Sequence, residues 1–160
     1  MNKQATAIGA LIVLLVAGAI VWLQWGQHAE LTGRILEART HGTTETDCIL
    51  VVDAELTNPS DVNFEVENTD AAIKAPDGAE ATGATVAAVD ALRVMEAFPL
   101  LMGSSNVPVL KLHDILAPRQ TLRRRLTFQF AGVGEKTLTA HRKSLVVKIH
   151  ERLGAVAELR

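Results

Sequence analysis

The sequence has a single cysteine, Cys48, among its 160 residues. One cysteine cannot form an internal disulfide in any compartment, so the fold must depend on its hydrophobic core. Cys48 falls on the apolar side of an alternating segment, where a lone cysteine usually behaves as a small buried hydrophobe. We therefore expect a packed and unreactive thiol.

Aromatic residues are also scarce, with two tryptophans, four phenylalanines and no tyrosine. Surfaces that bind nucleic acid combine basic groups with aromatic rings that stack on the bases. The basic residues of this chain are not interleaved with such rings, so we predict no nucleic-acid partner.

The formal net charge of −2 hides an uneven distribution of charge. Residues 26–100 hold 14 acidic and 4 basic residues, whereas residues 101–160 hold 4 acidic and 11 basic residues. If both parts pair into one domain, we expect neighbouring strands to complement each other in charge.

Patterns for catalysis, cofactors or metals are missing. The five histidines, at positions 28, 41, 113, 141 and 150, have no zinc-site spacing. Ser104 and Ser105 lack a nucleophile-elbow pattern. Residues 132–137, Gly-Val-Gly-Glu-Lys-Thr, superficially match a phosphate-binding loop, but Glu135 stands where a glycine is required, and a hairpin turn explains the glycines. We expect no enzymatic activity, no cofactor and no metal.

Residues 5–25 carry no charge and are long enough to cross a bilayer as a helix. This transmembrane helix would place the anchor side chains Leu11, Val13, Leu14 and Leu15 in lipid, and Trp22 and Trp25 at the far interface. A cleaved signal peptide is the alternative, because residues 17–19 (Ala-Gly-Ala) fit a cleavage pattern. The apolar run continues past that point, which favours an uncleaved signal anchor.

The layout predicts a single-pass protein of the inner (cytoplasmic) membrane. Residues 1–4, with Lys3, form a cytoplasmic tail, residues 26–30 a linker, and residues 31–160 an extracytoplasmic β-sandwich domain.

The domain is organised around residues 47–68, which read as two core strands joined by a turn. Cys48, Leu50 and Val52 share one apolar face of an extended chain, while Asp53 and Glu55 share the opposite, mostly wet face. The turn at residues 58–61 (Asn-Pro-Ser-Asp) separates this run from a second alternation at residues 62–66.

The remaining pattern predicts seven or eight short strands. Further strands are expected at residues 31–38, 71–75, 109–113, 122–130 and 145–149. Residues 82–98 are predicted as a strand followed by a short helix, in which Val86, Val89, Leu92 and Met95 recur every three residues. Arg123 and Arg125 would share a solvated outer face. Such spacing is typical of an all-β fold, an antiparallel β-sandwich.

Two motifs carry a resemblance to known families. The step at residues 55–60 (Glu-Leu-Thr-Asn-Pro-Ser) resembles the late-embryogenesis-abundant type 2 domain, where Asn-Pro ends a core strand. Residues 118–122 leading to Phe128 are similar to the telokin-like, immunoglobulin-like domain of bacterial membrane-anchored proteins, with Arg119 in place of a turn glycine. The resemblance covers residues 31–151 and implies an immunoglobulin-like sandwich without implying chemistry.

The segment 98–109 lies between prolines yet is apolar. Loops are normally polar because their backbone needs water, so we predict that this one contributes to a partner-binding surface. The side chains that would form it are Phe98, Leu100, Leu101, Met102 and Val107. The alternative is that the loop folds back to cover an open end of the sandwich.

Two functions follow from these observations. The first is a binding or assembly module without catalysis, held at the bilayer and contacting another envelope protein. The alternative is a ligand-sensing or lipid-handling domain that uses a gap between its sheets.

Overall fold

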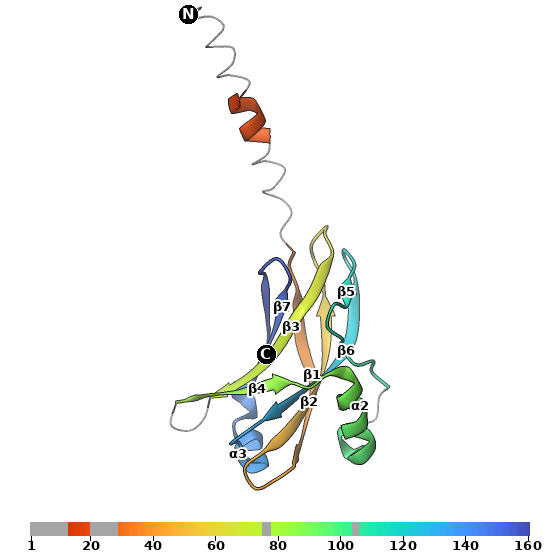
Figure 1. Cartoon of the computed structure of the whole chain (residues 1–160), viewed down its shortest axis with the longest axis vertical. Coiled ribbons are helices and arrows are strands. Elements are labelled where there is room, and N and C mark those ends of the chain that lie inside the picture. The colour runs from red at the N-terminus through yellow and green to blue at the C-terminus, as the bar shows by residue number, and fades with distance from the viewer. Residues whose placement is uncertain (1–12, 20–28, 75–77, 104–105) are drawn as a thin grey trace, which may run out of the picture.

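The computed structural model describes residues 13–19, 29–74, 78–103 and 106–160. It contains eight strands and a few short helical segments (Figure 1). The strands are β1 (Thr32–Gly42), β2 (Cys48–Thr57), β3 (Phe64–Lys74), β4 (Glu80–Thr85), β5 (Ile115–Leu116), β6 (Thr121–Phe130), β7 (Val146–Glu151) and β8 (Val156–Leu159). The helical segments of the domain are α2 (Ala88–Ala97), η1 (Pro99–Leu101), α3 (Glu135–Ala140) and η2 (Arg142–Ser144).

All strand pairs form one antiparallel sheet, in the order β1-β2-β6-β4-β3-β7-β8, with β5 added to β3. The predicted all-β antiparallel class is thus confirmed. Three details of the strand prediction are wrong. Residues 71–74 are the end of β3, residues 109–113 contribute only one bridge between Val109 and Arg125, and neither β5 nor β8 was expected.

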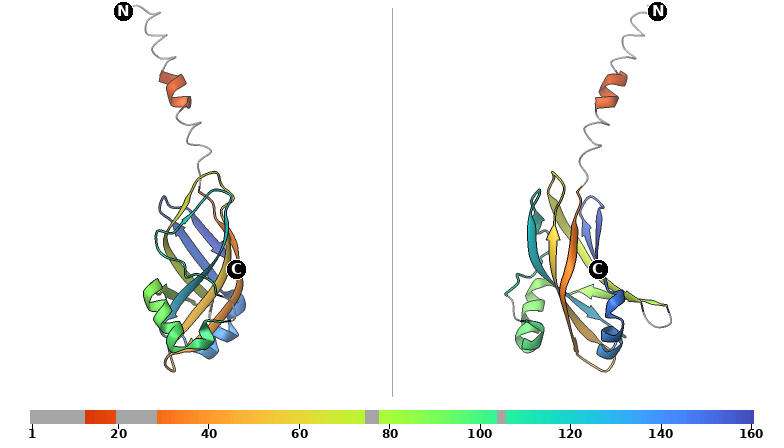
Figure 2. Two further views of the ribbon diagram at one scale, coloured as in Figure 1. Left: turned by 90° about the vertical axis from the view of Figure 1, so that its right-hand side faces the viewer. Right: turned by 180° about the vertical axis from the view of Figure 1, so that it is seen from behind.

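The sheet curls into a half-barrel, as the two views of Figure 2 show, and its interior holds the larger of two apolar clusters. Only two residue pairs join β4 to β6, so the sheet turns sharply there. The half with β1, β2 and β6 then faces the half with β3, β7 and β8. Side chains of both halves meet in the interior, among them Leu50, Phe128, Phe64 and Ile149.

Gly33 lets the two ends of the strand order approach each other. β1 lies beside β8, and a methyl group at Gly33 would come within 2.5 Å of the Glu55 carbonyl oxygen and 2.7 Å of Leu159 Cδ2. Only glycine fits such a close approach. The curl of the sheet therefore depends on a residue with no side chain.

The predicted core strands 47–57 and 62–68 are present, but they do not pair with each other. β2 pairs with β1 and β6, whereas β3 pairs with β4, β5 and β7. The turn between them crosses from one half of the sheet to the other.

Asn58 fixes that crossing. Its side chain is fully buried, and its amide Nδ2 donates to the carbonyl oxygens of Val62 at 2.8 Å and Leu116 at 2.9 Å. Its Oδ1 accepts hydrogen bonds from the backbone N–H and hydroxyl of Ser60. A buried amide with this many partners ties the turn to β5 and stabilises it.

The apolar face of β2 is buried as predicted, and Cys48 is fully buried with it. Burial, with Glu135 and Asp47 adding to it, raises the pKa of the Cys48 thiol to about 11. The prediction that the opposite face is mostly wet is wrong. Ile49, Val51 and Asp53 are buried there because α2 and η1 pack over them.

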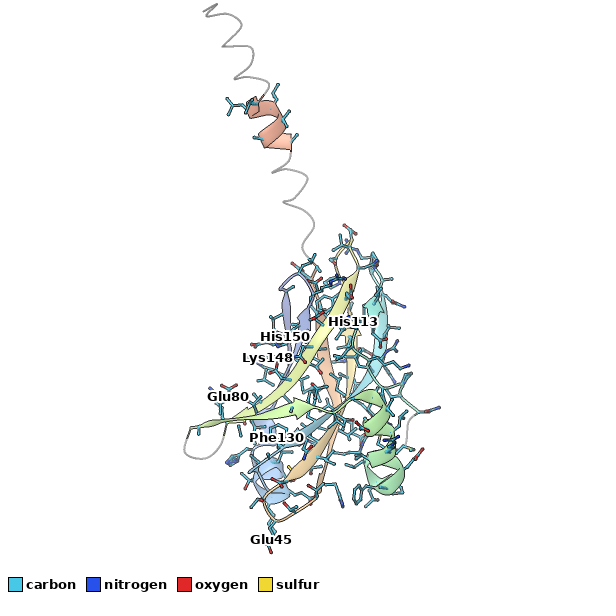
Figure 3. The ribbon with its side chains drawn as sticks, in the orientation of Figure 1. Glu45, Glu80, His113, Phe130, Lys148 and His150 are labelled. Carbon is cyan, nitrogen blue, oxygen red and sulfur yellow. The ribbon has the colours of Figure 1, made fainter. Side chains whose placement is uncertain are left out.

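β6 has the predicted inward residues, since Leu126, Phe128 and Phe130 lie in the core (Figure 3 labels Phe130). Arg125, expected on a solvated face with Arg123, is only 2% exposed. Charge complementarity between neighbouring strands is confirmed here, because the register places Arg125 opposite Asp53 and Arg123 opposite Glu55.

The hairpin turn predicted at residues 132–134 is wrong. Helix α3 follows them, and the Glu135 carboxylate accepts a hydrogen bond from the backbone N–H of Gly42 at 2.9 Å.

The predicted anchor falls largely outside the described residues, which include neither Leu11 nor Trp22 nor Trp25. Val13, Leu14 and Leu15 belong to a helical stretch at residues 13–19, and their side chains are exposed. Within the described part of the chain, no helix has the length and hydropathy of a membrane span.

Arg119 occupies the turn before β6 with a φ of 60°, the left-handed region that favours glycine. Its guanidinium contacts Asp61 at 2.9 Å, an exposed ion pair of small value. We expect Arg119→Gly to be more stable than Arg119→Ala by about 1 kcal/mol, since both lose the ion pair and only glycine relieves the backbone. Urea denaturation of the two variants measures the difference. Equal midpoints would contradict the strain at this turn.

Candidate functional site

The predicted partner-binding residues lie at the end of α2 and in the segment after it. Leu100 and Met102 are 86% and 42% exposed, whereas Leu101 is 1% exposed. Phe98 and Val107 are half-buried. Ser104 and Ser105 lie outside the described residues. The segment thus has an inner side formed by Leu101 and an outer side formed by its neighbours.

We call residues 88–103 the covering segment, because its inner side packs on the outer face of β2. Ala91 and Met95, four residues apart on α2, and Leu101 of η1 pack against Ile49 and Val51. Residues four apart share one face of a helix, which explains the pairing of Ala91 with Met95. The expected stripe through Val89 and Leu92 is wrong, since Val89 is 63% and Leu92 51% exposed.

A charge network, buried at Asp53 and Arg125 and reaching the surface at Glu37, lies beneath the covering segment. Asp53 Oδ1 accepts from Arg125 Nε at 2.6 Å and Asp53 Oδ2 from Arg125 Nη2 at 2.8 Å. Arg39 Nη2 donates to the same Oδ2 at 2.7 Å, and Arg39 Nη1 lies 2.5 Å from Glu37 Oε2. The four charges alternate in sign and sum to zero. Such bidentate pairing is what makes a buried carboxylate tolerable.

The network shifts two pKa values. Burial alone would raise the pKa of the Asp53 carboxyl, but hydrogen bonds from Arg125 and Arg39 outweigh it and hold that pKa below its ordinary value. Burial alone would lower the pKa of Arg39, but its hydrogen bonds to Asp53 and Glu37 raise it. Asp53 is therefore ionised at neutral pH.

Arg39 connects the network to the covering segment. Its Nε donates to the carbonyl oxygen of Leu101 at 2.8 Å. Gly103 lies directly against the same guanidinium, since a methyl group there would come within 2.4 Å of Arg39 Nη1. Gly103 also has a φ of +67°, which favours glycine. A side chain at this position is therefore disfavoured both by the contact with Arg39 and by the backbone conformation. These contacts hold the end of the covering segment in one position.

The outer side of the covering segment carries both apolar and charged side chains. Its exposed large apolar side chains are Val89, Leu92, Leu100 and Met102. The charged side chains of Asp90, Arg93 and Glu96 are exposed on α2 beside them. His41 of β1 contacts the ring of Phe98, with ring centroids 4.2 Å apart. The segment therefore presents apolar side chains to solvent from a backbone that is fixed from below.

Other candidate chemistry stays dispersed. His113 Nδ1 lies 3.2 Å from Glu65 Oε1, and His150 Nε2 lies 2.6 Å from Asp70 Oδ1. Both carboxylates belong to β3, whereas His150 lies on β7 and His113 lies outside the strands (Figure 3). Across the described residues, no group of three or more His, Cys, Asp or Glu side chains is placed to hold a metal ion.

Comparisons with known proteins do not assign the chain to a family. No family model matches the chain, and no curated protein matches it. One solved structure is similar, an uncharacterized β-sandwich protein from Clostridium difficile 630, at 8% identity over 83% of this chain and 80% of that chain, with a TM-score of 0.37. That score is too low to equate two folds, so the fold described above rests on the strand pairings of this chain.

Replacing Asp53 tests the network. We expect Asp53→Asn to lower the free energy of unfolding by about 3–5 kcal/mol, because Arg125 is left buried without its counterion. Glu55→Gln is the matched control on the same strand: Glu55 pairs with the exposed Arg34 and Arg123, and the change should cost less than about 1 kcal/mol. Urea denaturation at pH 7 measures both costs, and equal costs would contradict a special role for Asp53.

The network also predicts a pH dependence. A carboxyl group whose folded pKa is depressed contributes stability that is complete above its unfolded pKa, about 3.9, and is lost as the pH falls through the lower folded value. The difference in unfolding free energy between wild type and Asp53→Asn should therefore stay constant from pH 7 to about pH 5 and shrink below about pH 4. A difference that shrinks between pH 7 and pH 5 would contradict the depressed pKa.

Proposed function

We propose that this protein is a membrane-anchored binding or assembly module whose domain contacts another envelope protein through the outer side of the covering segment. The observation that carries the proposal is the exposure of Val89, Leu92, Leu100 and Met102 on a segment whose inner side is fixed. Catalysis is not part of this function.

The fixed position of the covering segment favours the free energy of binding. A loop that becomes ordered on binding loses conformational entropy, and this loss weakens the complex. Here the Arg39 hydrogen bond to Leu101 and the burial of Met95 already hold the segment in the free protein. A partner can therefore bury the exposed apolar side chains of this segment with little further loss of conformational entropy. The partner would present an apolar face of its own.

Location and fold family belong to the same proposal. The uncharged run at residues 5–25 supports a single-pass anchor in the inner membrane, with the domain on the extracytoplasmic side. The motifs at residues 55–60 and 118–128 support an immunoglobulin-like variant of the antiparallel fold.

The anchor is tested on isolated membranes and on spheroplasts. We expect the full-length protein to stay in the pellet after carbonate extraction of membranes, because the apolar run is inserted in lipid. Protease added to spheroplasts should remove the domain. A soluble form that begins near residue 20 would indicate a cleaved signal peptide instead, and protection of the domain until lysis would place it in the cytoplasm.

The partner surface is tested with a double variant, Leu100→Ser with Met102→Ser. Both side chains are exposed, so we expect a thermal midpoint within about 4 °C of wild type, since each surface substitution usually costs under about 0.5 kcal/mol. Copurification of the partner from detergent-solubilised membranes should be lost.

Two controls make the result specific. Leu153→Ser with Val156→Ser removes exposed apolar side chains outside the covering segment and should leave copurification intact. Leu101→Ser removes a buried side chain and should lower stability by about 2–5 kcal/mol. A partner profile that the Leu100 and Met102 variant leaves unchanged would remove this surface from the proposal.

A further inference from the structure

The end of the domain at which Ala29 lies is formed by the turns of three connections. These are residues 58–63 between β2 and β3, residues 117–120 between β5 and β6, and residues 152–155 between β7 and β8 (Figure 1). Helices α2 and α3 lie toward the opposite end, as the views of Figure 2 also show. Ala29 borders a hollow together with Val62 and Leu153, so the first described residue of the domain lies among these turns.

We call residues 152–155 the hairpin tip. Leu153 of this tip is 88% exposed, the largest exposed fraction of any large apolar side chain within the described residues. Its N–H donates to Glu151 Oε2 at 2.7 Å, and the Gly154 N–H donates to the Glu151 carbonyl oxygen at 3.0 Å. Gly154 closes the turn with a φ of +104°, which favours glycine. An ordered turn thus holds a leucine in solvent at a position where a polar residue is usual.

Two ion pairs lie at the same end of the domain. Arg152 Nη1 lies 3.3 Å from Glu65 Oε2, and Arg119 Nη2 lies 2.9 Å from Asp61 Oδ1. Each pair sums to zero, so these four side chains provide no net positive charge that would attract anionic lipid. What the hairpin tip offers to a surface is therefore an apolar side chain.

The chain before the domain limits how far this end can lie from the bilayer. The uncharged run ends at Trp25, and Ala29 packs against the core cluster. An extended chain advances at most about 3.5 Å per residue, so the steps from Trp25 to Ala29 span at most about 14 Å. A contact between the hairpin tip and lipid is then intramolecular. Tethering of this kind lets one apolar side chain sustain a contact that it would not form from solution.

We infer that the hairpin tip rests on the bilayer that holds the anchor, with the Leu153 side chain at the boundary between head groups and acyl chains. Burial there removes apolar surface from water. This inference rests on the anchor of the proposed function and adds an orientation to it. The covering segment, toward the opposite end, then faces away from the bilayer, where a partner can reach it.

The contact is tested by NMR on the full chain in phosphatidylcholine nanodiscs, with methyl-labelled leucine and valine. One sample contains a lipid with a nitroxide on its acyl chain, and another contains a water-soluble gadolinium chelate. We expect the lipid nitroxide to erase the Leu153 methyl signals and the chelate to spare them, because the side chain lies in lipid.

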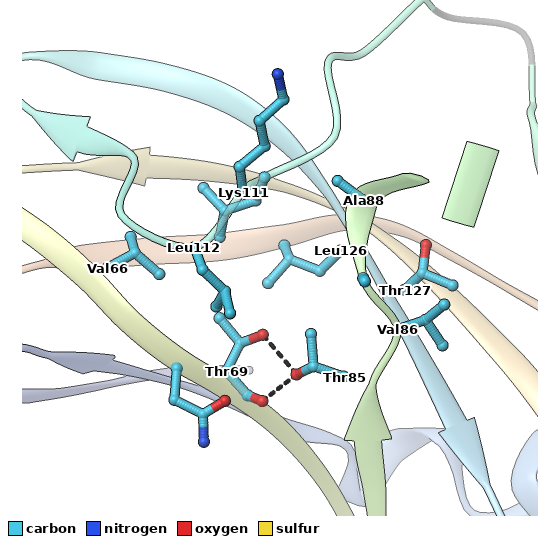
Figure 4. A pocket seen from close by; sticks show the side chains of 12 residues that line it. Val66, Thr69, Thr85, Val86, Ala88, Lys111, Leu112, Leu126 and Thr127 are labelled. Carbon is cyan, nitrogen blue, oxygen red and sulfur yellow. Dashed lines mark hydrogen bonds between the residues drawn. The ribbon is translucent and has the colours of Figure 1, made fainter. Parts of the chain in front are cut away.

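Two leucines of the same chain serve as controls. Leu100 is 86% exposed and lies toward the opposite end, so the chelate should erase its signals and the lipid nitroxide should spare them. Leu112 is 53% exposed and lines a pocket beside Leu126 of β6, away from the hairpin tip (Figure 4). The lipid nitroxide should weaken its signals less than those of Leu153.

A substitution tests the leucine side chain itself. Val62 borders the same hollow as Leu153 and reports on this end of the domain. Leu153→Ser should restore most of the Val62 signal that the lipid nitroxide removes, because the end is no longer held at the bilayer. The matched variant Leu100→Ser should leave the loss of Val62 signal unchanged. An equal effect of the two variants would overturn the inference.

The methyls of Leu14 and Leu15 separate failure of this inference from failure of the proposed anchor. If the lipid nitroxide erases them while Leu153 behaves like Leu100, the anchor stands and the tip contact is overturned. If it spares all of them, the anchor and the inference both fail. A Leu153 loss that requires added phosphatidylglycerol would overturn the apolar basis of the contact. Protection of Leu153 from the chelate without any effect of the lipid nitroxide would indicate a protein contact instead.

Discussion

The pairing of Asp53 with Arg125 is the interaction on which the outer layer of this domain depends. A carboxylate that is 2% exposed is tolerable only with close cationic partners, and Asp53 has two, on the strands at either side. Its partners fix the register of β1, β2 and β6 at one level of the sheet. Because Arg39 also holds the Leu101 carbonyl, the same carboxylate determines where the covering segment ends.

The second constraint is the short contact between β4 and β6. Two residue pairs are enough to keep the sheet continuous but too few to keep it flat, so the two halves fold toward each other around one core. The same shortness leaves the gap between β3 and β6, and residues 108–114 satisfy the backbone groups that border it. The curl of the sheet and the position of residues 108–114 are thus two consequences of the short pairing between β4 and β6.

Alternation along the chain predicts the strands well, since a core face such as Leu50, Val52 and Leu56 repeats every two residues. It fails where burial comes from a distant segment. Nothing near Asp53 in sequence indicates that α2 covers it, and its partner Arg125 is 72 residues away. One signal was present: Asp53 and Arg125 are opposite charges within two predicted strands, one in the acidic part of the chain and one in the basic part. Helix α3 was missed because glycines precede both turns and helices.

The sequence predicts either a loop that covers the sheet or a surface that binds a partner. In the structure these two predictions concern different side chains of the covering segment. Leu101, Ala91 and Met95 act as a cover, since their burial fills the outer face of β2. Leu100, Met102, Val89 and Leu92 add nothing to that cover, because they face solvent. Single exposed apolar residues are common on protein surfaces, so the argument for a partner is that four of them gather on one ordered segment.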